Sequence, residues 1–224
     1  MKEKKINLAT KITILRIIFT ILILIFIIVI YLLSYNNVDF FINSLIEIKL
    51  NNITISTINI YYLIIMGLFI IASLSDMLDG YIARKRNEIT DVGKFLDPLA
   101  DKMLIDSLLV FLSIGFNNSE TCLKYHWFLV VLMIIRDLLV DALRLLAAKK
   151  NIAIGANCWG KLKTWAQIIS ICAILLNGFP FAYFDYKWSS FLHIDDFICY
   201  ITAFISLFSG FIYYKNYFKL IKNT

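Results

Sequence analysis

The chain has 224 residues, of which 60% are hydrophobic and 17% charged, and its formal net charge is +6. Soluble domains are only about half apolar and about 25% charged, so this composition excludes an ordinary soluble globular protein. It predicts an integral membrane protein, and because no soluble basic module remains, it excludes nucleic-acid binding.

Six apolar runs are long enough to cross the hydrocarbon core of a bilayer. They occupy residues 11–34, 57–75, 98–115, 127–147, 162–179 and 195–214. The first run is longer than the core of a secretory signal and no small-residue cleavage site follows it, so we expect it to stay in the mature protein. The runs predict an all-α integral membrane protein with six transmembrane helices. Residues 1–224 would form a single membrane-embedded catalytic domain, with a long outer loop at 35–56.

The positions of lysine and arginine predict how the chain lies in the membrane, because cationic loops are retained on the cytoplasmic side. In a six-span arrangement one side holds most cations: Lys2, Lys4, Lys5, Arg84, Lys85, Arg86, Lys149, Lys150, Lys161, Lys163, Lys215, Lys219 and Lys222. The opposite loops carry only Lys49, Lys124 and Lys187. We therefore expect both termini to be cytoplasmic, although individual lysines can serve topology alone.

Four aspartates stand where the second apolar run meets the third, namely Asp76, Asp79, Asp97 and Asp101. On a helix, the spacing of three in the first pair and of four in the second places each pair on one face. If the two helices pack closely through Gly80 and Gly93, all four carboxylates converge.

Clustered carboxylates at a membrane boundary repel one another and are poorly solvated, and a divalent cation removes this penalty. With no Cys or His nearby, the oxygen donors favour two Mg²⁺ or Mn²⁺ ions over zinc. Paired hard ions suit phosphoryl transfer. The alternative from spacing alone is that the acids cap helices and pair with neighbouring cations, namely Arg84, Lys85, Arg86 and Lys94.

The residues from Asp76 to Asp101 match the pattern D-x2-D-G-x2-A-R-x8-G-x3-D-x3-D without a gap. In this the chain resembles the CDP-alcohol phosphotransferases. The resemblance implies a bundle of six membrane helices, usually a homodimer, that moves a substituted phosphate from a CDP-linked lipid to an alcohol and releases CMP. It further implies that the four aspartates hold two metal ions and that Asp101 is the base for the acceptor hydroxyl. Nucleotide contacts would come from Asn7, Gly80, Ala83 and Arg84.

Two further stretches combine cations with apolar runs. Arg136 and Arg144 are two helical turns apart and share a face with Val140. An arginine inside a span is costly unless it meets an anion, which here is either a bound phosphate or the neighbouring Asp137 and Asp141. Lys161 and Lys163 lie at the start of the fifth run, where they can bind a phosphorylated acceptor or serve topology.

The stretches RDLLVDALR and GKLKTWAQ, together with NLATKITILR at residues 7–16, resemble the phosphatidylglycerophosphate synthases within this family. The usual proline at the start of the first helix is missing here, where Ile12 and Thr13 stand. This likeness implies that CDP-diacylglycerol and sn-glycerol 3-phosphate are the substrates, at the cytoplasmic face of a bacterial cell membrane and in contact with its lipids. Arg136, Arg144, Lys161 and Lys163 would then bind the acceptor phosphate.

Two alternatives remain open from the sequence. Within the family, the acceptor could be different, as in cardiolipin synthases or enzymes that use an inositol compound. From another class, the acids could form the ion site of a divalent-cation transporter, which predicts carboxylates near the middle of the membrane. The acids instead stand at run ends beside a basic segment, which favours the enzyme.

Overall fold

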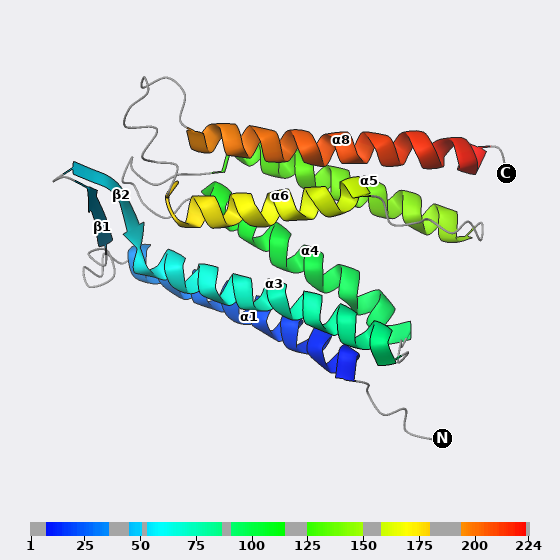
Figure 1. Ribbon diagram of the computed structural model, residues 1–224, viewed down its shortest axis with the longest axis horizontal. Helices are drawn as coiled ribbons and strands as arrows, with labels where there is room; N and C mark the ends of the chain where they lie inside the picture. The colour runs from blue at the N-terminus through cyan, green and yellow to red at the C-terminus, as the bar shows by residue number, and fades with distance from the viewer. Residues whose placement is uncertain are drawn as a thin grey trace. The chain divides into compact units, whose positions relative to one another are not determined.

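A computed structural model describes the backbone of residues 8–35, 45–50, 53–86, 91–114, 125–149, 158–179 and 194–222, and side chains mainly within 13–33, 58–75, 99–114, 125–147, 158–179 and 196–217. Six α-helices lie in these ranges: α1 (Leu8–Tyr35), α3 (Ile60–Arg86), α4 (Asp91–Ile114), α5 (Trp127–Lys149), α6 (Cys158–Leu175) and α8 (Ile194–Lys222) (Figure 1). Each predicted apolar run coincides largely with one of these helices. The helical character and the order of the elements are therefore confirmed.

A β-hairpin precedes α3, so the expectation of a loop at residues 35–56 and of a purely α-helical chain is wrong in this segment. Strands β1 (Leu45–Leu50) and β2 (Ile53–Asn59) pair antiparallel, from Leu45 opposite Asn59 to Leu50 opposite Ile53. The register shifts after Ile48, where β2 contributes one extra residue as a bulge. Isoleucine alternates with polar residues over positions 46–49 and 53–56, which is the period of a strand and not of a helix.

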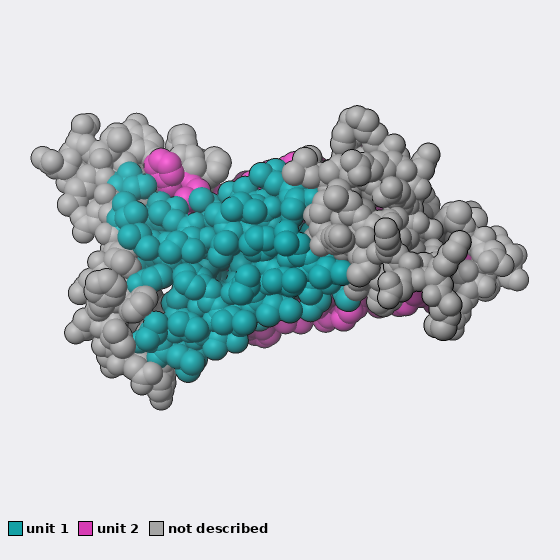
Figure 2. Space-filling model, turned by 90° about the horizontal axis from the view of Figure 1, so that it is seen from below, with its two compact units in different colours: residues 1–111, 116–118 teal, residues 112–115, 119–224 magenta. Residues whose placement is uncertain are grey.

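The chain divides into two compact units (Figure 2). Unit 1 comprises residues 1–111 and 116–118, and unit 2 comprises residues 112–115 and 119–224. The prediction of a single catalytic domain stays a prediction.

Unit 1 is built on the antiparallel pair α1 and α3, which lie side by side (Figure 1). Ile23 of α1 and both Ile65 and Phe69 of α3 are fully buried. The ring of Tyr62 in α3 meets the ring of Phe111 in α4 edge to face, with 6.1 Å between their centroids. The C-terminal end of α3 and the start of α4 lie at the same end of this unit as the start of α1 (Figure 1).

Unit 2 is built on α8, which packs against both α5 and α6. Helices α5 and α8 run in the same direction, and α6 runs in the opposite one (Figure 1). Near the starts of α5 and α8, His126 Nε2 and Asp196 Oδ1 are 3.0 Å apart. Buried Tyr125 hydrogen-bonds through its hydroxyl to Ser170 Oγ at 3.0 Å. Burial raises the pKa of the Tyr125 phenol well above its ordinary value, so this hydroxyl stays neutral.

The end of α6 follows from two residues in the left-handed region, Asn177 with φ 50° and Gly178 with φ 77°. The Gly178 amide donates to the Ala173 carbonyl and the Asn177 amide to the Ile174 carbonyl, both at 2.9 Å. These bonds satisfy carbonyls of the last turn, as in a Schellman-type end. The predicted run to residue 179 therefore stops being helical at Leu175.

All six helices carry large apolar side chains on their exposed faces, among them Leu22, Ile71, Ile114, Leu138, Ile169 and Phe204. By length and composition, two windows in the described helices could cross a membrane, Thr13–Leu33 in α1 and Asp196–Tyr217 in α8. An apolar exterior around polar interior groups is a feature of membrane proteins, because exposing so much apolar surface to water is unfavourable.

Candidate active site

The aspartate motif lies on two consecutive helices, as its spacing predicts. Asp76 and Asp79 belong to the C-terminal part of α3, and Asp97 and Asp101 to the first half of α4. Most side chains predicted for this site lie outside the described part, namely those of Asn7, Asp76, Asp79, Gly80, Ala83, Arg84, Gly93 and Asp97. Their convergence on two metal ions therefore stays a prediction.

Asp101, the last acid of the motif, is paired with Arg16 of α1. Arg16 Nη1 donates to Asp101 Oδ1. The arginine is fully buried, so its charge needs a counter-ion, and Asp101 provides one. Thr20 Oγ1 donates to the Arg16 carbonyl at 2.9 Å and is itself buried, which adds a polar contact on the same face of α1. The first helix is thus tied to the motif through the residue predicted to act as base.

The donor chemistry of Asp101 suits a hard divalent ion. Its side chain is 40% exposed, so it remains accessible to a ligand despite the contact with Arg16. Carboxylate oxygens are the donors that Mg²⁺ and Mn²⁺ prefer. No group of three or more His, Cys, Asp or Glu that could hold a metal occurs among the described residues, because three of the four predicted ligands fall outside them.

A second set of polar groups is buried in unit 2, where α5, α6 and α8 meet. This polar cluster consists of Arg136 and Asp137 of α5, Lys163 of α6 and Ser209 of α8. Arg136 Nη1 donates to Asp137 Oδ1 at 2.6 Å, and Nη2 donates to Ser209 Oγ at 2.8 Å. Lys163 Nζ donates to Asp137 Oδ2. One carboxylate therefore serves two cations from two helices.

The polar cluster places two cations around one carboxylate. Arg136 is 8% exposed, Asp137 3% and Lys163 9%, so two cations and one anion are withdrawn from solvent together. The pairing of Arg136 with Asp137 is the local contact that the sequence left open, and Lys163 shares the same carboxylate. Arg136 Nε is also buried without a hydrogen-bond partner in the described structure. An anion bound here would meet two cations in a low-dielectric setting, where charge-assisted hydrogen bonds are strong.

Polar residues reach this interior because they recur at the helical period. Lys163, Gln167 and Ser170 are buried on one face of α6. Thr202, Ser206 and Ser209 follow the same spacing on α8 and are buried as well. Residues four and three apart stack on one helix face, so each helix presents a polar stripe inward.

The other two predicted acceptor residues are exposed. Arg144 lies two turns after Arg136 and also contacts α8, where its Nη2 donates to the Tyr213 hydroxyl at 3.2 Å. Its guanidinium carbon lies 5.3 Å from the centroid of the Tyr213 ring. Lys161 is exposed on α6 and does not share the buried face of Lys163. Thus the structure brings Arg136 and Lys163 together and leaves Arg144 and Lys161 outside the cluster.

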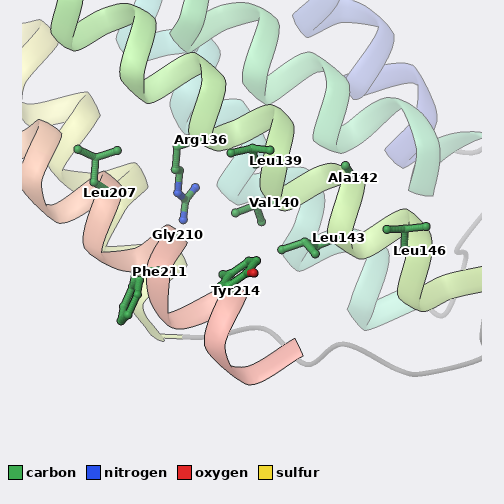
Figure 3. Close-up of a pocket in the computed structure, with 10 residues that line it drawn as sticks. All are labelled: Arg136, Leu139, Val140, Ala142, Leu143, Leu146, Leu207, Gly210, Phe211 and Tyr214. Atoms are coloured by element: carbon green, nitrogen blue, oxygen red, sulfur yellow. The ribbon is translucent and has the colours of Figure 1, made fainter. Parts of the chain in front are cut away.

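Beside the polar cluster, α5 and α8 enclose a groove of about 470 Å³ (Figure 3). Its walls are almost entirely apolar: Leu139, Val140, Ala142, Leu143, Leu146, Leu207, Gly210 and Phe211, with Arg136 and Tyr214 as the polar members. Such a lining can contact hydrocarbon, whereas Arg136 is its only charged group.

Comparison with known proteins identifies the family. The model of the CDP-alcohol phosphatidyltransferase family matches residues 6–208, which is most of the chain. The chain belongs to the CDP-alcohol phosphatidyltransferase family. It is therefore an enzyme, and the aspartate motif on α3 and α4 is the pattern by which its sequence resembles this family.

Several curated relatives in this family are named CDP-diacylglycerol–glycerol-3-phosphate 3-phosphatidyltransferase. The protein from Bacillus subtilis is 38% identical over 157 residues, which cover 70% of this chain and 75% of the relative. The one from Rickettsia felis is 33% identical over 152 residues, covering 66% and 75%. The one from Haemophilus influenzae is 31% identical over 147 residues, covering 63% and 70%.

Sequence reasoning about this phosphatidyltransferase missed three partners. It noted Arg16 only as part of the N-terminal resemblance, although a single arginine within a long apolar run signals a buried counter-ion. It treated Asp137 as a local neutraliser of Arg136 and not as the link to Lys163. It assigned no role to Ser209, for which the polar stripe of α8 was the available signal.

The shared carboxylate predicts that Asp137→Asn destabilises the enzyme. The substitution removes the carboxylate to which both buried cations donate, and breaking a buried ion pair costs about 3 kcal/mol or more. We expect a clearly lower Tm of the purified protein in detergent. Asp196→Asn is the matched control, because Asp196 makes a half-exposed pair with His126 and its loss should change Tm little. Equal Tm values for Asp137→Asn and wild type would contradict the charge balance described here.

Proposed function

We infer that the chain transfers the phosphatidyl group of CDP-diacylglycerol to sn-glycerol 3-phosphate, giving phosphatidylglycerophosphate and CMP in phospholipid biosynthesis. The observation that carries this function is that relatives of 31%, 33% and 38% identity all bear the name of this activity. Membership in the family, over residues 6–208, supports the reaction type. The acceptor is named by the relatives, and the polar cluster has the charge that a phosphate-bearing acceptor requires.

For the donor, we propose that Asp76, Asp79, Asp97 and Asp101 hold two Mg²⁺ or Mn²⁺ ions. When bound, these ions spread the negative charge of the diphosphate and of the departing phosphate. Gly80, Ala83, Arg84 and Asn7 would contact the cytidine and the diphosphate. The chemistry of the donor set supports this proposal, because all four predicted ligands are carboxylates and the described one is accessible.

For the chemical step, Asp101 accepts the proton of the primary hydroxyl of the acceptor. That oxygen forms a bond to the phosphorus of the phosphatidyl group, and the bond from this phosphorus to the oxygen of CMP breaks, so CMP leaves with that oxygen. No covalent intermediate with the enzyme is needed. Arg16 holds one carboxylate oxygen of Asp101, which fixes the base in place and lets it act by position.

For the acceptor, we propose that Arg136 and Lys163 attract the phosphate of sn-glycerol 3-phosphate, with exposed Arg144 and Lys161 contributing at the surface. The burial of both cations in the polar cluster, beside one shared carboxylate, supports the first pair. Arginine and lysine side chains bind phosphate through charge-assisted hydrogen bonds, which are about twice as strong as hydrogen bonds between neutral groups.

The arrangement in the membrane is also a proposal. Six helices would cross the cytoplasmic membrane of a bacterium, with both termini and the active site on the cytoplasmic side and with the enzyme acting as a homodimer. The distribution of lysine and arginine along the chain and the exposed apolar side chains of the helices support the orientation and the spans.

An acceptor panel tests the function. Purified enzyme with labelled CDP-diacylglycerol and Mg²⁺ should release CMP rapidly with sn-glycerol 3-phosphate. It should do so at least about 100-fold more slowly with glycerol, phosphatidylglycerol or inositol phosphate, because a site built for one polar group rejects analogues that leave it unpaired. Preference for phosphatidylglycerol would identify a cardiolipin-forming enzyme instead, and metal flux into liposomes without CMP release would identify a transporter.

Replacement of the base tests the chemical step. Asp101→Asn keeps an oxygen that can accept from Arg16 but removes the proton acceptor, so we expect turnover to fall about 100-fold or more. CDP binding should fall much less, because the other three acids remain. Rates of CMP release and titration with CDP in the presence of Mg²⁺ measure the two effects. Turnover near the wild-type level would remove Asp101 from the role of base.

A further inference from the structure

The side chain of Arg136 is held from two sides. Its Nη1 group donates to Asp137 on the same helix at 2.6 Å, and its Nη2 group donates to Ser209 on α8 at 2.8 Å. Because Asp137 is the next residue along α5 and its other contact is to α6, it does not fix the guanidinium relative to α8. Ser209 is therefore the contact that sets the direction of the guanidinium relative to α8.

Gly210, the next residue of α8, leaves the space that the arginine stem occupies. A Cβ atom at this position would lie 2.7 Å from Arg136 Cγ and 2.9 Å from its Nε, which is closer than such atoms approach one another. Figure 3 shows Arg136 extending from α5 toward Gly210. Cγ belongs to the stem and not to the flexible tip, so a side chain at residue 210 would force the whole arginine to another rotamer.

These two contacts do not use the Nε–H donor of Arg136. Nε is buried and has no hydrogen-bond partner in the described structure. Fixing an arginine side chain costs about 2 kcal/mol of rotamer entropy. Because Ser209 and Gly210 already fix Arg136 in the folded enzyme, this cost is not added when a ligand binds. The family match ends at residue 208, so neither residue belongs to the segment by which the family was recognised.

We propose that Ser209 and Gly210 are positioning residues, which hold Arg136 in the conformation that meets the phosphate of the acceptor. Ser209 orients the guanidinium through Nη2, and Gly210 admits the stem against the backbone of α8. Neither residue touches the substrate. The inference rests on the proposed acceptor role of Arg136 and assigns to the last helix a part in acceptor recognition.

The test is the steady-state kinetics of the full-length enzyme with CDP-diacylglycerol and sn-glycerol 3-phosphate as varied substrates. Ser209→Ala should raise KM for sn-glycerol 3-phosphate about 10-fold, which corresponds to one hydrogen bond to a charged group, with kcat and KM for CDP-diacylglycerol within about 2-fold of wild type. Gly210→Ala should raise the same KM at least as much. Ser209→Thr, which keeps the hydroxyl, should restore most of the affinity.

Two matched variants separate positioning from general damage. Ser206→Ala removes a buried serine hydroxyl one turn earlier on α8, and this hydroxyl has no hydrogen-bond partner in the described structure. Gly67→Ala adds a Cβ at a helical glycine where nothing lies within 4 Å. Both should leave all kinetic constants unchanged. If Gly210→Ala does not fold, Ser209→Ala with its threonine rescue decides the question alone.

The outcomes distinguish this inference from the proposed function. If Arg136→Lys leaves KM for sn-glycerol 3-phosphate unchanged, the acceptor role of Arg136 fails and the inference with it. If Arg136→Lys raises this KM but Ser209→Ala does not, only the positioning role is overturned. If Ser209→Ala lowers Tm and affects both substrates equally, the serine merely ties α8 to α5. The inference predicts that Ser209→Ala adds little in an Arg136→Lys background, because both changes act through one side chain.

Discussion

The organisation of unit 2 depends on one carboxylate that is shared between two cations. Asp137 accepts hydrogen bonds from Arg136 on its own helix and from Lys163 on α6, all three being withdrawn from solvent. In a low-dielectric interior each charge must be compensated or lost. This shared carboxylate links α5 to α6. We propose that the two cations around it also bind the acceptor phosphate.

Both units use a buried arginine in this way, with different consequences. In unit 1, Arg16 is fully buried and Asp101, its partner, is partly exposed, so the acid stays accessible while one of its oxygens is held. In unit 2, Arg136 and Asp137 are both buried, and a second buried cation, Lys163, shares the carboxylate. A held, accessible carboxylate suits a proton acceptor, and a pair of buried cations suits the binding of an anion. We propose that the first group serves the chemical step and the second the acceptor.

Much of the helical framework could be predicted because it depends on local pattern. Apolar runs of membrane length located all six described helices, and the spacing of Asp76, Asp79, Asp97 and Asp101 placed the motif on two of them. Arg136 and Arg144 were expected on one face, and both contact α8. The hairpin at Leu45–Asn59 was missed because runs were judged by length alone, although isoleucine alternates there with period two.

The partners of the charged residues could not be predicted in the same way. Arg16 and Asp101 are 85 residues apart, and Arg136 and Ser209 are 73 apart, so no local spacing connects them. Likewise, the close approach of Arg136 to Gly210 depends on how α5 crosses α8. Charge balance could have limited the possible partners to acids, since a lone arginine in an apolar run requires a counter-ion somewhere in the fold. The meeting of the four aspartates concerns side chains beyond the described ones and stays a prediction.

The central claim is that Arg136 and Lys163, the two cations around Asp137, bind the acceptor phosphate. Calorimetric titration of the purified enzyme, saturated with CDP and Mg²⁺, with sn-glycerol 3-phosphate tests it most directly. The account predicts binding of sn-glycerol 3-phosphate but not of glycerol, and at least about 10-fold weaker binding to Lys163→Met, which loses one charge-assisted contact, while CDP binds as before. Equal affinity of wild type and Lys163→Met for sn-glycerol 3-phosphate would contradict the account.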